Sequence, residues 1–169
     1  NNQPFIYNYS ERDNFEMYYG NPLYLIDRFA DYFAFSFSRD PLKKLVSNYL
    51  MFKQKKFRIS QLELLYKKTN ENLDWEEFLN IIQKINNHHW NKQCLFIPEF
   101  INRFPNNYIG KLEHYETDWE LICRRINIDY VCNHINKTEV NELNNSNLSF
   151  IISTTKKIYK DDYYRFNYK

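Results

Sequence analysis

Glycine and cysteine are scarce in this 169-residue sequence, and long apolar runs are missing. The two glycines, Gly20 and Gly110, lie far apart, which excludes a Walker A loop and a dinucleotide-binding fingerprint, since both need closely spaced glycines. The three cysteines form no Cys-x-x-Cys pair, and their odd number argues against a disulfide framework and favours a reducing compartment. No run of about 18 apolar residues is present, so no membrane-spanning helix is predicted.

Aromatic residues are abundant, with 15 Tyr, 14 Phe and 3 Trp. Hydrophobic residues make up 43% of the chain and the net charge is only +2, which is typical of a globular protein and not of a disordered one. The charge is uneven, because residues 43–68 contain eight basic side chains and one acidic one. This excess is either a solvated helical surface or a site for an anion, and the composition leaves both interpretations open.

A strand followed by an amphipathic helix is predicted near residue 40. Residues 33–37 form a short aromatic run, typical of a buried interior strand of a parallel sheet. Asp40 is a good helix N-cap, and Pro41 suits the first helical position. An apolar stripe with helical spacing follows, made of Leu42, Leu45, Val46, Tyr49 and Leu50. Together these features predict half of a βαβ unit.

Three further helices are predicted from capping-box patterns that begin at Ser60, Asp74 and Thr117. The second helix is expected to bury Trp75, Phe78, Leu79, Ile82 and Ile85, and the third to bury Trp119, Ile122 and Ile126. Residues 108–112 predict a second strand, 127–149 a long polar loop, and 155–166 a helical face that carries Ile158, Tyr159, Tyr163 and Phe166. The predicted fold class is α/β, a parallel sheet flanked by helices.

Arg39, Lys43 and Ser47 form a candidate anion site. Arg39 lies at the end of the predicted strand, where open α/β sheets bind ligands, and Lys43 and Ser47 share one helix face. A guanidinium, an ammonium and a hydroxyl would converge on one anion, together with free amides of the helix N-terminus. Alternatively, Arg39 pairs with Asp40 or another carboxylate, and Ser47 is only a surface hydroxyl.

Four segments, spread in order over residues 32–168, resemble motifs of the membrane-type carbohydrate sulfotransferases, the heparan and chondroitin class with its bacterial relatives. The segments are Arg39-Asp40-Pro41 with Leu45-Val46-Ser47-x-Tyr49, His89-Trp90-x-x-Gln93, Gly110-x-x-Glu113 with Asp118-Trp119, and Tyr159-x-x-Asp162-x-x-x-Phe166-x-Tyr168. The resemblance implies a P-loop-NTPase-like sulfotransferase fold in a single domain over residues 1–169. It also implies transfer of a sulfuryl group from 3′-phosphoadenosine 5′-phosphosulfate to a carbohydrate hydroxyl.

The resemblance assigns the 3′-phosphate of the donor to Arg39 and Ser47, and the helix spacing adds Lys43 beside them. It implies mainly structural roles for the third segment and the tail, and it places the region of His89 and Trp90 near the acceptor cleft at most. The family's N-terminal strand and its Lys- and Gly-containing loop for the 5′-phosphosulfate have no counterpart here. A catalytic His is expected before Arg39, but all four histidines follow it, so no catalytic residue is assigned.

Because that loop is missing and the chain begins at Asn1, we expect that an N-terminal part is truncated or absent and that this chain does not transfer sulfate by itself. The main alternative is a noncatalytic structural or assembly subunit with a degenerate sulfotransferase fold. A nucleic-acid-binding module is a weaker alternative, because the aromatic residues fall at core spacings and the net charge is low.

No metal site is predicted, because the His and Cys spacings fit no common zinc site. The expected partner is a carbohydrate acceptor, not a nucleic acid. The sequence leaves the acceptor's identity and the oligomeric state open. A bacterial member of the family would lie in the cytoplasm, which we favour, and a eukaryotic one in the Golgi lumen.

Overall fold

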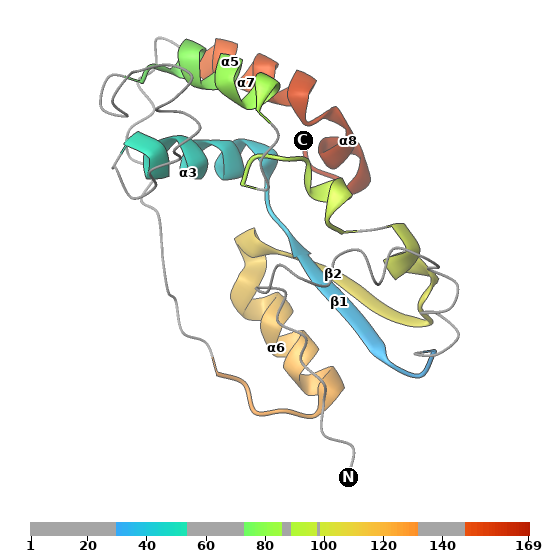
Figure 1. Cartoon of the computed structure of the whole chain (residues 1–169). Helices are drawn as coiled ribbons and strands as arrows, with labels where there is room; N and C mark the ends of the chain where they lie inside the picture. Colours follow the sequence, from blue (N-terminus) through green and yellow to red (C-terminus); the bar gives the residue numbers. More distant parts are fainter. Residues whose placement is uncertain (1–29, 54–72, 86–88, 98, 132–147) are drawn as a thin grey trace. The chain divides into compact units, whose positions relative to one another are not determined.

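The computed structural model describes residues 30–53, 73–85, 89–97, 99–131 and 148–169, and the chain divides into two compact units (Figure 1). In the first unit lie β1 (Phe33–Ser38), η3 (Glu99–Arg103), β2 (Asn106–Lys111), η4 (Leu112–His114) and α6 (Tyr115–Ile126). In the second lie α3 (Pro41–Lys53), α5 (Trp75–Lys84), η2 (Gln93–Leu95), α7 (Leu148–Ile158) and α8 (Lys160–Arg165). Helices and parallel strands agree with the predicted α/β class. The single domain over residues 1–169 stays a prediction.

The sheet of the first unit consists, within the described residues, of the parallel strands β1 and β2. Both predicted strands are confirmed, although β2 begins at Asn106, two residues earlier than expected. The expected full burial of residues 33–37 is wrong, because these side chains are only partly buried. The physical reason is that, among the described strands, β1 has a hydrogen-bonded neighbour on one side, and not on two.

Aromatic rings join β1 to α6, which packs along both strands (Figure 1). Because side chains alternate along a strand, residues 33, 35 and 37 place their rings on one face. The ring of Phe35 lies 6.1 Å from that of Trp119, and the ring of Phe37 lies 5.2 Å from that of Tyr115. The period-2 placement of phenylalanine therefore provides the surface on which α6 rests.

Asp118 connects α6 to the end of β2. Its carboxylate accepts a hydrogen bond from the Tyr108 hydroxyl at 2.8 Å and another from the Lys111 backbone N–H at 2.7 Å. The predicted capping box at Thr117 is wrong, because α6 begins at Tyr115 and Thr117 lies within its first turn. The helix buries Ile122 and Cys123, whereas Trp119 and Ile126 are only partly buried.

Gly110 occupies a position in β2 that has no room for a side chain. A Cβ atom there would lie 2.6 Å from Cε1 of Phe37 and 3.2 Å from Cβ of Asp118. Both neighbours are held, since the Phe37 ring packs on Tyr115 and the Asp118 carboxylate bonds Lys111. The tight contact explains why glycine stands at this point of the strand.

Gly110→Ala is therefore expected to lower the free energy of unfolding by about 1–3 kcal/mol, the usual cost of overpacking a well-filled site. Urea denaturation followed by circular dichroism measures this difference. Asn106→Ala, an exposed substitution in the same strand, is the control and should change stability far less. Equal stability of the two variants would contradict the close packing around Gly110.

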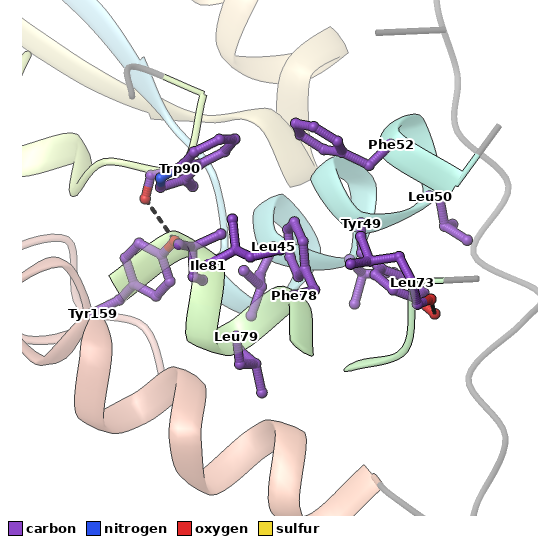
Figure 2. Packing of buried hydrophobic residues seen from close by; sticks show 12 residues of the cluster. Leu45, Tyr49, Leu50, Phe52, Leu73, Phe78, Leu79, Ile81, Trp90 and Tyr159 are labelled. Atoms are coloured by element: carbon purple, nitrogen blue, oxygen red, sulfur yellow. Dashed lines mark hydrogen bonds between the residues drawn. The ribbon is translucent and has the colours of Figure 1, made fainter. Parts of the chain in front are cut away.

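The second unit has a continuous hydrophobic core between α3 and α5 (Figure 2). The predicted stripe of α3 is buried except at Leu42, which is partly buried, and the predicted apolar side of α5 is largely buried. The ring of Phe52 lies 5.9 Å from that of Phe78 and 5.5 Å from that of Trp90. Figure 2 also shows Tyr159 beside Trp90 at one end of this cluster.

The helix ends of the second unit follow from local chemistry. Asp40 and Asp74 cap α3 and α5 as predicted, since the Asp40 carboxylate accepts the N–H groups of Leu42 and Lys43 and the Asp74 carboxylate accepts that of Glu77. The predicted helical face over residues 155–166 is divided, because α7 ends at Ile158 and α8 begins at Lys160. The helix predicted from Ser60 lies outside the described residues. The described helices include none with the length and apolar character needed to cross a membrane.

Candidate functional site

Arg39 connects the end of β1 to the start of α3, and its backbone is held by a single side chain. The Arg39 N–H donates to Oε1 of Gln93 at 2.8 Å, and Nε2 of Gln93 donates to the Arg39 carbonyl at 2.6 Å. The Arg39 side chain is half-buried. Among the described residues, none forms a hydrogen bond or an ion pair with its guanidinium, so the expected alternative pairing with Asp40 is not formed there.

Lys43 and Ser47 stand one turn apart on α3, as predicted. Lys43 is exposed and Ser47 is half-buried. The expectation that free amides of this helix N-terminus would help bind an anion is wrong. Oδ1 of Asp40 accepts the N–H groups of Leu42 and Lys43, and the Asp40 carbonyl accepts that of Lys44. Any anion at this place is therefore held by side chains.

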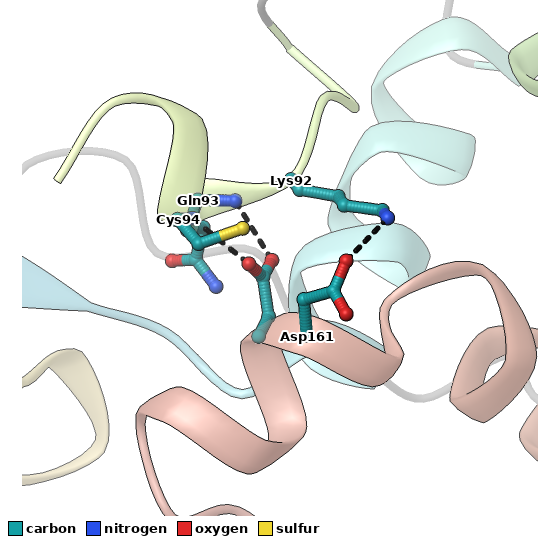
Figure 3. Close-up of polar contacts among 5 residues, drawn as sticks. Lys92, Gln93, Cys94 and Asp161 are labelled. Carbon is teal, nitrogen blue, oxygen red and sulfur yellow. Dashed lines mark hydrogen bonds and ion pairs between the residues drawn. The ribbon is translucent and has the colours of Figure 1, made fainter. Parts of the chain in front are cut away.

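Gln93 is itself fixed by a buried carboxylate of α8 (Figure 3). Oδ2 of Asp162 accepts the Gln93 backbone N–H at 2.7 Å, and Oδ1 accepts the Cys94 N–H at 2.8 Å. Beside it, Nζ of Lys92 forms an ion pair with Oδ2 of Asp161 at 2.6 Å. The start of η2 is thus capped by a side chain that lies far away in the sequence.

The turn before η2 is held from both α3 and the C-terminal segment. Nδ2 of Asn48 donates to the His89 carbonyl at 2.8 Å, and the Lys44 ammonium donates to the Asn91 carbonyl. The Tyr159 hydroxyl donates to the Trp90 carbonyl at 2.6 Å. These bonds satisfy backbone groups that no regular secondary structure pairs.

Burial shifts the pKa of two groups near η2. It lowers the pKa of Lys44 to about 8, although the charge of Asp162 opposes this shift. It also raises the pKa of the Cys94 thiol to about 11, with help from the hydrogen bond and charge of Asp162. A thiol with this pKa stays protonated at neutral pH, so Cys94 is unsuited to act as a thiolate nucleophile.

Three of the four sequence segments that resemble sulfotransferase motifs therefore meet in the second unit. The Gln93 side chain bonds the Arg39 backbone, and the Asp162 side chain of the tail bonds the Gln93 backbone, whereas the Gly110 segment contributes to the first unit. The buried Tyr159, Asp162 and Phe166 agree with the structural role expected for the tail. The sequence analysis missed Lys44 and Asn48, and their only signal was a shared helix face beside the apolar stripe.

The fold and this arrangement define the class of the protein: an α/β protein in which a strand leads through Arg39, Asp40 and Pro41 into an amphipathic helix. A family model described as the sulfotransferase family matches residues 7–169. The chain therefore belongs to the sulfotransferase family, which confirms the resemblance found in its motifs. Comparisons with curated proteins and with solved structures gave no match.

Proposed function

We propose that this member of the sulfotransferase family binds 3′-phosphoadenosine 5′-phosphosulfate and serves the transfer of its sulfuryl group to a carbohydrate hydroxyl. In this proposal Arg39, Lys43 and Ser47 bind the 3′-phosphate of the donor. The observation that carries it is the half-buried Arg39, whose backbone is fixed while no described residue neutralises its guanidinium. No catalytic residue is assigned.

The residue types suit a phosphate. A phosphate group offers several acceptor oxygens and negative charge, and a guanidinium fork can bind two of these oxygens at once. A lysine adds a point charge, and a serine hydroxyl donates one further hydrogen bond. Since Asp40 occupies the amides at the start of α3, these side chains supply the binding energy of the proposed site.

Arg39→Ala is expected to weaken binding of adenosine 3′,5′-bisphosphate by about 1.5–3 kcal/mol, which corresponds to about 10- to 150-fold in the dissociation constant. Isothermal titration calorimetry with the wild type and the variant measures this change. Arg124→Ala is the matched control, because it removes an exposed arginine that, among the described residues, pairs with Glu120 alone at i,i+4. Equal affinity of the wild type and Arg39→Ala would refute the phosphate assignment.

A noncatalytic subunit with the same fold is the second candidate, because binding of a phosphate by Arg39, Lys43 and Ser47 does not by itself require catalysis. Radiolabelled donor and a panel of glycans separate the two candidates. Turnover above background supports the enzyme. Donor binding without turnover supports the noncatalytic role.

A further inference from the structure

The Gln93 side chain makes a matched pair of hydrogen bonds with one residue, Arg39. Its carboxamide presents an acceptor and a donor side by side, and these meet the Arg39 N–H at 2.8 Å and the Arg39 carbonyl at 2.6 Å. Arg39 lies between a strand and a helix, so its backbone groups have no partner in either element. Gln93 therefore pairs both backbone groups of Arg39, as a neighbouring strand would do in a sheet.

Gln93 is suited to this task because its own position is fixed. Its side chain is buried, and its backbone N–H is bound to the buried carboxylate of Asp162 at 2.7 Å. The hydrogen bonds from Gln93 thus hold Arg39 at its backbone, and they come from a residue 54 positions away in the sequence. Because the backbone of Arg39 is already fixed, fewer conformations are lost when its guanidinium binds a ligand.

We propose that Gln93 is a positioning residue for the 3′-phosphate of the donor: by holding both backbone groups of Arg39, it directs the Arg39 guanidinium to that phosphate. The inference rests on the proposed function, in which Arg39 binds the phosphate. Gln93 itself contacts Arg39 and not the donor.

The test compares two nucleotides that differ only in the 3′-phosphate, adenosine 3′,5′-bisphosphate and adenosine 5′-monophosphate. Gln93→Met keeps the size of the side chain and removes both hydrogen bonds. It is expected to weaken binding of the bisphosphate about tenfold and to leave the affinity for the monophosphate unchanged. In the Arg39→Ala background, Gln93→Met is expected to have no further effect on the bisphosphate, because the group it positions is gone.

Gln83→Met is the matched control, because within the described part of the chain the Gln83 amide bonds only the Leu79 carbonyl of its own helix, at 2.8 Å. It should leave the affinities for both nucleotides unchanged. If Gln93→Met does not fold, Gln93→Asn replaces it, because its shorter side chain cannot reach both groups of Arg39. Circular dichroism verifies the fold of each variant before titration.

A merely structural role for Gln93 would weaken binding of both nucleotides equally, or would add to the effect of Arg39→Ala, and either result overturns the inference. If Gln93→Met binds the bisphosphate as tightly as the wild type while Arg39→Ala binds it weakly, the inference is also overturned, but the proposed function stands. If Arg39→Ala itself binds the bisphosphate as tightly as the wild type does, the proposed function and the inference fail together.

Discussion

Asp162→Ala is expected to lower the free energy of unfolding by about 3–5 kcal/mol, because two hydrogen bonds to a charged group are lost together. The carboxylate is fully buried and accepts the backbone N–H groups of Gln93 and Cys94 at 2.7 and 2.8 Å. Removing it leaves the Gln93 amide buried without an acceptor, which costs more than the loss of an exposed bond. Urea denaturation at pH 7 measures the change.

The neighbouring Asp161 provides the control for this prediction. Asp161→Ala removes a carboxylate one position away, and its partner is the Lys92 ammonium at the surface. Exposed ion pairs contribute little, so this variant should stay close to the wild type in stability. Asp162→Asn keeps one acceptor oxygen and should fall between the two alanine variants. A small loss in Asp162→Ala, comparable to that in Asp161→Ala, would show that η2 does not depend on this cap.

The stability of the protein is expected to rise with pH, relative to Lys44→Met, from about pH 8 upward. Burial lowers the pKa of Lys44 to about 8 from its ordinary value of 10.5. Between these two values the unfolded chain binds the proton that the folded chain has released, so raising the pH favours the folded state. The gain is about 1 kcal/mol by pH 9 and approaches about 3 kcal/mol near pH 10.5.

Urea midpoints of the wild type and Lys44→Met, measured from pH 7 to pH 9, test this dependence. The comparison is needed because burial raises the pKa of Cys94 to about 11 and that of Tyr163 to about 12, and these groups destabilise the folded state as the pH rises further. Lys43→Met removes an exposed lysine of the same helix and controls for the lost charge. Parallel pH curves for wild type and Lys44→Met would contradict a partly buried ammonium with a lowered pKa at this position.

The sequence predicted those parts of the fold that depend on neighbours in the chain. The alternation of phenylalanine in β1, the cap by Asp40 and the stripe of α3 are all local patterns, and the structure contains each of them. The capping box at Thr117 was an accidental match to the same kind of pattern. Asp118, its second residue, instead bonds Lys111 of β2, and no local rule reveals that contact.

The candidate site was only partly predictable for the same reason. Arg39, Lys43 and Ser47 could be named because they surround one strand–helix junction. The motif resemblance drew attention to Gln93 and Asp162. It did not show that Gln93 holds Arg39, or that Asp162 holds Gln93. Those roles depend on contacts across 54 and 69 positions of the chain, whose geometry the spacing of motifs does not contain.

The long sequence separation between Gln93 and Asp162 also affects when the second unit can fold during synthesis of the chain. A ribosome adds about 5–20 residues per second, so the 69 positions that separate the two residues take on the order of 3–14 seconds. Throughout this interval the nascent segment around Gln93 lacks the carboxylate that caps it. The second unit therefore matures late in translation, and a premature stop codon anywhere between the two residues would leave the Arg39 junction without its support.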